Sequence, residues 1–576
     1  MNIPNHLKKY IVDQSYESYS YIDHAVWRYI MRISIDFFNE YAHKSYKEGL
    51  KKTGITIDKI PRIDEMDKLL QNFGWRAVCV RGFIPPKAFM EFQSLGILPI
   101  AADMRSFDHL TYTPAPDIVH ESAGHAPIIV DSDYSEYLSM YGEVATKSIL
   151  SIKDIEIYNL IRKLSDMKEH VSKDSSEIEH IEKEINTLMN SISNLSEAAE
   201  LARMNWWTVE YGLVGDIANP KIYGAGLLSS VAESQNCLGK NVKKIPFSLD
   251  CINYPYDITE QQPQLFICKN FKELTSALNE YSETMAYKVG GRIGLEKAIS
   301  AQTINTCEND IGIQISGKFT NMICNNDNPI YIQLSGPVQI SHNGCELIGH
   351  GGDYHKDGYG TIIGNLKGTD TPLHSMSLVE LESYGIKVNS NVELNFDSGI
   401  VLTGTVENIL SLDGMNIIIS FSGCLVSFGA KNLFMPEWGT YDLACSSSID
   451  SVYSGASDID QFYRYLDYYD APTTSAKFSS FENTSQLDSC LKELRHIREN
   501  GLYSDKLLEE IYNNSIDKGF NNWLVNMEII ELICNKDSSF AKMLSSQIRV
   551  LSNKKSDLGR SITRGIPIYF FTKQFR

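Results

Sequence analysis

Apolar residues recur at helical spacing in the first part of the chain. The pattern runs from Tyr21 to about Tyr46, where aromatic residues are frequent, and it returns in the segment IPRIDEMDKLLQNFGW. Spacings of three and four residues between apolar positions are typical of amphipathic helices. The stretch from Arg81 to Asp117 differs, because the prolines in RGFIPPKAF and TYTPAPD interrupt it. It predicts a backbone that is largely extended or turning.

A second helical pattern, with a seam of apolar residues, covers about residues 154–199. Its apolar positions alternate in spacings of three and four, which is the heptad repeat of helices that pack against each other. They are Ile157, Leu160, Leu164, Met167, Val171, Ile178, Ile181, Ile185, Leu188, Ile192 and Leu195. The repeat breaks at Asp174 within SKDSSE, where serine and aspartate favour a turn or a helix N-terminus. We expect an antiparallel helical hairpin; one long helix is the alternative.

Alternation of apolar and polar residues replaces the helical pattern near Ser300. Ile311, Ile313 and Ile315 are one example, and turn signals such as FDSG and LDGMN separate such stretches. This predicts short strands in hairpins to about Tyr453, after which helical spacing returns. The chain is thus predicted to be multidomain. It is expected to be mostly helical over residues 1–299, β-rich over 300–453 with no role indicated, and helical over 454–576.

Length, charge and cysteine content narrow the function classes. With 576 residues the chain is too long for one hydrophobic core. Its net charge of -19 argues against nucleic acid or an anionic membrane as the main partner. No apolar run reaches the ~18 residues that span a bilayer, and the start of the chain lacks the apolar core of a signal peptide. Eleven cysteines without a CxxC pair are typical of a reducing compartment, so we expect a cytoplasmic protein.

The segment PDIVHESAGHAP holds two histidines five positions apart, His120 and His125, with Glu121 between them. A zinc peptidase helix has the spacing HExxH, which puts both imidazoles on one face. Five residues of an ideal helix turn through ~500°, so the second ring points about 140° away from the first. Both rings bind one ion only if the helix loosens, and Gly124 and Pro127 bracket His125 in a way that favours this. The alternative is a pair of ordinary, partly buried histidines.

A third ligand is expected in NWWTVEYGLVGD, where Glu210 lies among aromatic residues. A carboxylate in so apolar a setting costs free energy unless it is paired or bound to a cation. Two neutral imidazoles and one carboxylate form the facial triad of non-haem Fe(II) oxygen chemistry. On ligand identity alone, a catalytic zinc ion is the competing assignment.

Seven ordered segments resemble the biopterin-dependent aromatic amino acid hydroxylases, the family of the phenylalanine, tyrosine and tryptophan monooxygenases. They are DHAVWRYI, IPRIDEMDKLL, GWRAVCVRGFIPPKAF, YTPAPDIVHESAGHAP, WWTVEYGL, IYGAGLLSSVAES and ITEQQPQLF, between about Tyr21 and Tyr287. The resemblance implies that residues 1–299 form the mostly α catalytic domain of this family, with the hairpin as an insertion. It implies Fe(II) bound by His120, His125 and Glu210. It also implies O2 as co-substrate and insertion of one oxygen atom into the ring of an aromatic amino acid.

The same resemblance implies a tetrahydropterin cofactor similar to tetrahydrobiopterin, bound next to the iron. The residues implied to bind it are Gly82, Phe83, Ile84, Phe89 and Glu121. A flat, electron-rich ring is expected to stack on Phe89, because offset aromatic stacking is worth ~0.5 to 1.5 kcal/mol beyond area burial. This role also explains why a carboxylate follows the first histidine of the motif.

For the amino acid substrate, the resemblance implies that Arg105 binds the carboxylate through two hydrogen bonds. The other substrate-binding residues implied are Thr113, Asp117, Ser229 and Glu233 at the polar end, and Pro116, Trp206 and Tyr211 around the ring. Phenylalanine is the expected substrate, since Trp206 resembles the phenylalanine and tyrosine enzymes, whereas tryptophan hydroxylases tend to have phenylalanine there. Tyrosine or tryptophan hydroxylation by the same mechanism is the alternative.

The chain departs from the family pattern in several respects besides the hairpin insertion. Asn205 stands where phenylalanine hydroxylases commonly show a tyrosine near the metal, and the part after Ser300 has no counterpart in the family. Two other function classes therefore stay open. A zinc hydrolase with Glu121 as base leaves the loop around Phe89 unexplained, and the intact metal ligands argue against a non-catalytic scaffold. A homo-oligomer through the seam 157–195 or the C-terminal half is a further expectation.

One more cluster lies in SHNGCELIGHGGDYHKDGYG, outside the resemblance. It contains His342, Cys345, His350, Asp353 and His355. Two of its histidines repeat the separation of the first pair. Five glycines from 349 to 360 predict a turn-rich loop between strands, in which polar side chains satisfy backbone groups. We prefer that interpretation to a second metal site.

Overall fold

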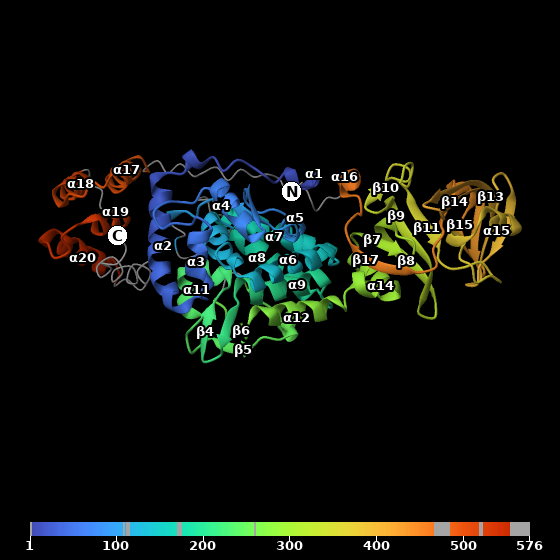
Figure 1. Cartoon of the computed structure of the whole chain (residues 1–576), viewed down its shortest axis with the longest axis horizontal. Coiled ribbons are helices and arrows are strands. Elements are labelled where there is room, and N and C mark those ends of the chain that lie inside the picture. The colour runs from blue at the N-terminus through green and yellow to red at the C-terminus, as the bar shows by residue number, and fades with distance from the viewer. Residues whose placement is uncertain are drawn as a thin grey trace.

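The computed structural model describes residues 3–107, 110, 116–169, 175–257, 261–465, 484–517 and 522–552. Figure 1 shows three parts in a row. A mostly helical part lies in the middle, and the β-rich part lies at one end. The helices α17 to α20 lie at the other end, beside α2 (Tyr21–Tyr41). The order of helical, β-rich and helical regions agrees with the prediction, whereas the domain boundaries themselves stay predictions.

The middle part has a helical core to which two small sheets are added. α2 begins after Ser20, whose hydroxyl accepts a hydrogen bond from the N–H of Asp23, while the Asp23 carboxylate accepts one from the N–H of Ser20. The other helices here are α3 (Ser45–Lys52), α4 (Ile63–Leu70), α5 (Pro86–Ser94), α6 (Ser132–Lys147), α9 (Glu197–Asn205), α10 (Ala225–Ser229), α11 (Val231–Asn236), α12 (Phe271–Ser282), α13 (Ala286–Val289) and α14 (Gly291–Ala301).

One of the two sheets is the parallel pair of β1 (Arg76–Val80) and β2 (Ile97–Ala101). The other has the strand order β4-β3-β6-β5. Its strands are β3 (Leu213–Asp216), β4 (Asn219–Ile222), β5 (Lys243–Pro246) and β6 (Gln264–Cys268). β3 begins directly after the segment that contains Glu210, so this sheet is anchored next to one of the predicted metal ligands.

The prediction of an extended or turning backbone from Arg81 to Asp117 is wrong for α5. Pro86 occupies the first turn of this helix. Proline is tolerated there because its missing N–H has no partner within the helix in any case, and its fixed φ suits the helical backbone. The two prolines of RGFIPPKAF therefore begin a helix instead of preventing one.

Most of the predicted apolar seam lies on two helices, α7 (Ile152–Glu169) and α8 (Ser175–Asn190), whereas its last two residues, Ile192 and Leu195, follow the end of α8. Lys163 Nζ lies 3.1 Å from Glu177 Oε1, and Lys153 Nζ donates a hydrogen bond to the Ser191 carbonyl at 3.0 Å. The start of one helix thus meets the end of the other, and the two run antiparallel. The side chains packed between them are Leu160, Ile161, Leu164, Met167, Ile178, Ile181 and Ile185. The predicted turn at Asp174, and Val171 of the seam, lie outside the described residues.

Two antiparallel sheets form the β-rich part. The first has the order β10-β9-β8-β7-β17 with β11 also paired to β9, and the second has the order β12-β13-β14-β15 with β16 paired to β14. The strands of the first are β7 (Ile304–Asn309), β8 (Ile313–Asn325), β9 (Asn328–His342), β10 (Cys345–Glu346), β11 (Gly358–Ile362) and β17 (Ile449–Ser454). Those of the second are β12 (Asn391–Asn395), β13 (Ile400–Leu412), β14 (Met415–Phe428), β15 (Lys431–Phe434) and β16 (Tyr441–Ala444). Because β17 pairs with β7, this part ends beside its beginning.

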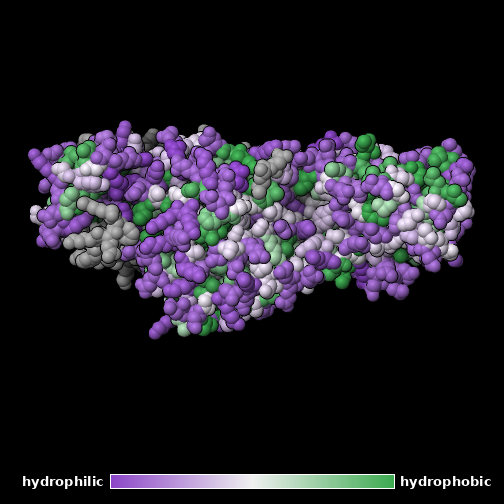
Figure 2. All heavy atoms as spheres, viewed as in Figure 1, coloured by the Kyte–Doolittle hydropathy of each residue, from purple (hydrophilic) through white to green (hydrophobic). Residues whose placement is uncertain are grey.

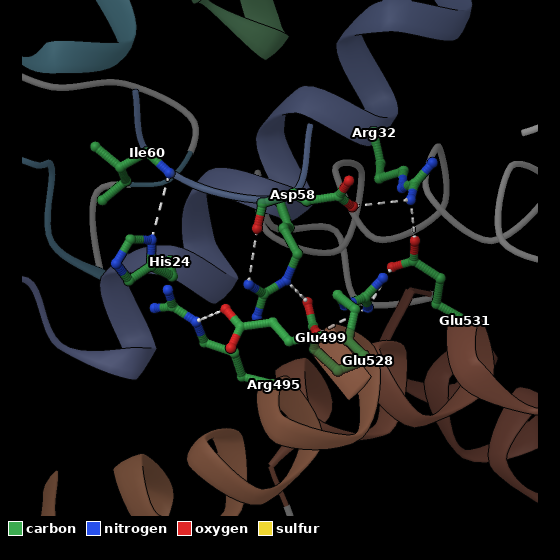
Figure 3. Close-up of polar contacts among 10 residues, drawn as sticks. His24, Arg32, Asp58, Ile60, Arg495, Glu499, Glu528 and Glu531 are labelled. Atoms are coloured by element: carbon green, nitrogen blue, oxygen red, sulfur yellow. Dashed lines mark hydrogen bonds and ion pairs between the residues drawn. The ribbon is translucent and has the colours of Figure 1, made fainter. Parts of the chain in front are cut away.

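The C-terminal helices dock on α2 through buried ion pairs. Arg28 Nε lies 2.9 Å from Glu528 Oε1, and both side chains are 1% exposed. Arg498 Nη2 lies 3.0 Å from the other oxygen of Glu528. Arg32 also faces Glu531, as Figure 3 shows. The helices are α17 (Thr484–Asn500), α18 (Asp505–Asp517), α19 (Trp523–Leu532) and α20 (Ser539–Ser552).

The surface is polar with small apolar groups. Figure 2 shows these groups separated by hydrophilic side chains on the face in view. Leu378 and Val379 of α15 (Leu378–Ser383) are among the most exposed apolar residues. Within the described ranges, none of the helices combines the length and the apolar composition that a membrane span requires.

Candidate active site

The two histidines of the motif lie on a π-helix, Val119–His125. A π-helix bonds residue i to residue i+5, so side chains five positions apart return to the same face. His120 Nε2 and His125 Nε2 are 3.1 Å apart as a result. The predicted loosening of the helix is thus confirmed, and it extends over the whole motif instead of only its end.

Gly124 has a further role that the sequence did not indicate. A Cβ atom at this position would lie 2.8 Å from the carbonyl oxygen of Ala225, the first residue of α10. The glycine therefore lets α10 lie directly against the π-helix. The last residue of α10 is Ser229, and its hydroxyl lies 2.9 Å from His120 Nδ1. This contact orients the ring so that Nε2 faces the other histidine.

Glu210 reaches the same point from a second π-helix, Trp206–Glu210. Its Oε2 lies 3.3 Å from His120 Nε2, and its Oε1 lies 3.4 Å from His125 Nε2. Ligands at ~2.0 to 2.2 Å from one ion, in tetrahedral or octahedral geometry, are separated by about 2.8 to 3.6 Å. The three side chains are therefore spaced as ligands of a single first-row metal ion.

The protonation of His120 and Glu210 also suits metal binding. Burial lowers the pKa of His120 to about 4, so its imidazole is neutral at neutral pH. Burial opposes ionisation of Glu210, but the adjacent imidazoles of His125 and His120 outweigh it and lower the pKa of this carboxyl to about 2. A neutral imidazole and an ionised carboxylate are the forms that bind a metal ion. At His125, burial favours the neutral ring, but the Glu210 carboxylate outweighs it and raises the pKa, so a metal ion would bind there in competition with a proton.

A pocket of about 500 Å³ opens beside the three ligands. All five residues predicted to bind the pterin line it: Gly82, Phe83, Ile84, Phe89 and Glu121. Glu121 Oε2 is buried and has no hydrogen-bond partner among the described residues. Asn205 also lines the pocket, and its Oδ1 is likewise buried without a hydrogen-bond partner among the described residues. Buried polar atoms without a partner are rare, so both are positions at which a bound molecule would supply the missing donor.

Arg105 lines the pocket, but three nitrogen atoms of its guanidinium already donate hydrogen bonds within the protein. Its Nε and Nη2 donate to the two oxygens of Asp117 at 2.6 and 2.9 Å, and Nη1 donates to the Ser229 carbonyl at 3.2 Å. Asp117 Oδ1 also accepts the N–H of His120 at 3.0 Å. Asp117 does not line the pocket, so it connects Arg105 to the π-helix that carries the two predicted histidine ligands.

Of the other residues predicted to bind the substrate, some line the pocket and some do not. Pro116, Trp206, Tyr211 and Ser229 line the pocket, and Glu233 does not. Glu233 Oε1 instead accepts the N–H of Gln262 at 3.2 Å, and the Gln262 side chain accepts from Trp206 Nε1 at 3.2 Å. Glu233 thus contacts the residue that positions Trp206. Thr113 lies outside the described residues.

Trp206 is the middle ring of an aromatic stack. Its centroid is 4.5 Å from that of Tyr211 and 4.4 Å from that of Tyr256, with interplanar angles of 26° and 12°. Both faces of the indole are therefore covered, and the stack as a unit forms one wall of the pocket. Tyr256 was not predicted, because nothing in the sequence near NYPYDI links it to Trp206.

Two regions outside the predicted site also reach the pocket. Tyr158 and Ile161 of α7 line it, and Tyr158 Oη donates to the Ile84 carbonyl at 3.1 Å. From the β-rich part, Ser454 lines the pocket, and its carbonyl accepts a hydrogen bond from Lys87 Nζ at 2.6 Å. The hairpin is thus not peripheral at its base, and the β-rich part contacts the pocket directly.

Comparisons with known proteins agree on one family. Residues 9–160 and 175–295 match the family model described as biopterin-dependent aromatic amino acid hydroxylase. Phenylalanine-4-hydroxylase of Chromobacterium violaceum is 27% identical over 271 residues, which are 46% of this chain and 76% of that protein. The enzyme of the same name from Pseudomonas aeruginosa is 27% identical over 270 residues, 46% of this chain and 86% of that protein.

A similar solved structure is that of the Chromobacterium violaceum phenylalanine hydroxylase with iron (III) and 7,8-dihydrobiopterin. The match has a TM-score of 0.38 and 24% identity, and it covers 49% of this chain and 92% of that chain. In the sequence comparison, the residues left out between the two matched ranges are 161–174, which belong to the end of α7 and the segment after it. His120, His125 and Glu210 all lie within the matched ranges.

Proposed function

Residues 9–160 and 175–295 belong to the biopterin-dependent aromatic amino acid hydroxylase family, and from this premise we propose that the protein is an iron- and tetrahydropterin-dependent monooxygenase. Its proposed reaction is hydroxylation of an aromatic amino acid ring, with phenylalanine converted to tyrosine. The observation that carries the proposal is the spacing of the His120, His125 and Glu210 donor atoms beside the pocket. The choice of phenylalanine rests on the relatives, which are phenylalanine hydroxylases.

Different residues of the pocket would bind the iron ion, the pterin and the amino acid substrate. Fe(II) would be held by the two imidazoles and the Glu210 carboxylate, and the pterin would lie against Phe89 with Glu121 Oε2 accepting one of its N–H groups. When bound, iron and the reduced pterin together supply the electrons that activate O2. The chain itself orients the amino acid through Arg105, and its aromatic stack at Trp206 keeps water from the reacting ring.

An anaerobically iron-loaded sample tests the proposal directly. It is mixed with a tetrahydropterin and O2 and supplied with phenylalanine, tyrosine or tryptophan. We expect tyrosine from phenylalanine as the main product. A sample that purifies with zinc and forms no hydroxylated product from any of the three would favour a hydrolase instead, and a loaded sample without any turnover would favour a non-catalytic scaffold.

An Arg105→Lys variant is expected to raise the KM for phenylalanine by about 10-fold, with little change in iron content. Lysine keeps the positive charge next to Asp117 but loses the planar fork, and a hydrogen bond to a charged group is worth ~1.5 to 3 kcal/mol. Steady-state kinetics and metal analysis give the two readouts.

Arg76→Lys is the matched control for that variant. Arg76 forms the same two-pronged pair, through Nε and Nη2 to the oxygens of Asp67 at 2.7 and 2.8 Å, but it does not line the pocket. An equal KM in the two variants would mean that Arg105 serves the fold alone.

A Tyr158→Phe variant is expected to raise the KM for the tetrahydropterin about 5-fold and to leave the iron content unchanged. The variant removes only the hydroxyl that holds the Ile84 carbonyl, and such a hydrogen bond contributes ~1 kcal/mol. Tyr16→Phe is the control, because Tyr16 Oη likewise donates to a backbone carbonyl, that of Ile60, at 2.8 Å. If both variants behave alike, the base of the hairpin has no part in pterin binding.

The remaining expectations are part of the proposal. They are a catalytic domain over residues 1–299, a β-rich domain over 300–453, a helical domain over 454–576, and a homo-oligomer formed through the hairpin or the C-terminal half. A cytoplasmic location has support from the cysteines, since all eleven are free thiols. The aromatic amino acid is the proposed partner, and neither nucleic acid nor a membrane is proposed as one.

A further inference from the structure

A second group of metal-binding side chains lies in the β-rich part, far along the chain from the active site. His350, His355 and Asp442 each offer one ligand atom, and these atoms all lie within 4.8 Å of one another. His350 Nδ1 and His355 Nε2 are 3.2 Å apart. The corresponding separation of His120 and His125 is 3.1 Å. The second pair of imidazoles is thus spaced like the first.

Backbone hydrogen bonds to β9 fix the positions of the two histidines. The carbonyl of His350 accepts the N–H of Ile340 at 2.9 Å, and the carbonyl of His355 accepts the N–H of Val338 at 3.1 Å. Both partners belong to β9, so the loop between the histidines is fixed to the first sheet at two points. The loop is therefore a preformed support and not a loose turn.

The carboxylate comes from the other sheet. Asp442 lies on β16, is 4% exposed, and is more than 80 residues from either histidine in the sequence. Ser420 Oγ donates to its Oδ1 at 2.6 Å, and Tyr359 Oη donates to its backbone carbonyl at 2.8 Å. Such contacts fix the orientation of a carboxylate in the way that partners behind a metal ligand do. The three donors thus meet where the two sheets face each other.

Of the other polar residues of the loop, Tyr354 forms a hydrogen bond with the Asp442 carboxylate, and two more do not contact the cluster. Asp353 accepts hydrogen bonds from Tyr465 Oη and from Arg464, and Cys345 is exposed. In the absence of an ion, a hydrogen bond between the two imidazoles would explain their separation. It does not explain why a buried carboxylate converges on both of them from another strand. Two histidines and one aspartate are, in contrast, a common ligand set for a divalent first-row ion.

We propose that His350, His355 and Asp442 form a second metal site, which binds a divalent first-row ion such as zinc and joins the two sheets of the β-rich part. Three protein ligands leave the fourth position of a tetrahedral ion to water. Because one ligand comes from β16 and two come from the loop on β9, the ion links elements that otherwise meet only through packing and hydrogen bonds. This proposal does not depend on the function of the active site.

Zinc binding by the full-length protein tests it. In a His120→Ala/His125→Ala variant the proposed active site lacks two of its three ligands. Zinc that this variant retains is therefore not bound at the active site. This variant is stripped with a chelator, dialysed against buffer with zinc and then against buffer alone, and analysed for metal content. We expect one zinc ion per chain, and we expect less than about a tenth of that when His355→Ala or Asp442→Asn is added.

The matched control is His342→Ala in the same background. His342 is the last residue of β9, contacts Asn343, and is not part of the cluster. We expect this variant to keep its zinc. Circular dichroism compares the folding of all variants, and His350→Ala gives a third removal of a ligand if another variant unfolds. Absence of zinc in the background variant, or zinc that survives every removal of a ligand, would overturn the proposal.

Discussion

A His125→Ala variant is expected to lose its iron and its hydroxylated product together. Removing an outer partner of a metal ligand typically costs ~10 to 100-fold in metal affinity, and loss of a ligand itself should cost more. Only two donors would remain, His120 Nε2 and the Glu210 carboxylate, and two ligands hold a divalent ion poorly. The measurement combines iron content with product formation from phenylalanine.

Two further variants make that result specific. Ser229→Ala removes the hydroxyl 2.9 Å from His120 Nδ1, so we expect only the ~10 to 100-fold loss in metal affinity that is typical of an outer partner. His180→Ala alters an exposed histidine of α8 and should change neither readout. Full iron content and full activity in His125→Ala would contradict the assignment of the active site.

The second large effect is expected at the ion pairs that dock the C-terminal helices on α2. A Glu528→Gln variant leaves Arg28, whose side chain is 1% exposed, without its paired charge, while Arg498 keeps its contact with Glu531. Breaking a buried ion pair by removing one partner costs ~3 to 5 kcal/mol, because an uncompensated charge stays buried. We expect α19 to open more readily by this amount, measured as the loss of hydrogen-exchange protection in its backbone.

Glu499→Gln is the matched control for this variant. Glu499 pairs with Arg495 at 2.7 Å within α17, but its side chain is 56% exposed. Surface pairs of this kind contribute ~0.3 to 0.5 kcal/mol. Hydrogen exchange in α19 should therefore be nearly unchanged in the control. Equal protection in the two variants would show that packing alone, such as that of Trp523 on Tyr29, holds the helices in place.

Much of the candidate active site could be predicted from the sequence because its residues come in short, dense motifs. His120, Glu121 and His125 lie within one turn and a half of helix, so their identities already favour a metal centre over a pair of ordinary histidines once Glu210 is added. The five-residue spacing even required an altered helix, and the structure has a π-helix there. Glu210 was found because a carboxylate among aromatic residues requires a partner.

The same local reasoning failed at the prolines and left out distant residues at the glycine-rich loop. The prolines near Phe83 suggested an irregular backbone, yet a proline in the first turn begins α5. In the loop with His350 and His355, the glycines suggested that polar side chains serve only the backbone. That interpretation considered the loop alone, since Asp442 lies on a strand of another sheet.

Helical and strand periodicity, capping and the chemistry of the motifs were determined by the sequence itself, because they depend on residues within a few positions of one another. Only the tertiary structure decided which distant residues meet. The contact of Lys87 with Ser454, the stack of Trp206 with Tyr256 and the hydrogen bond from Tyr158 to Ile84 join residues 367, 50 and 74 positions apart. No local pattern encodes such pairs, because they form when whole helices and sheets bury their apolar faces against each other.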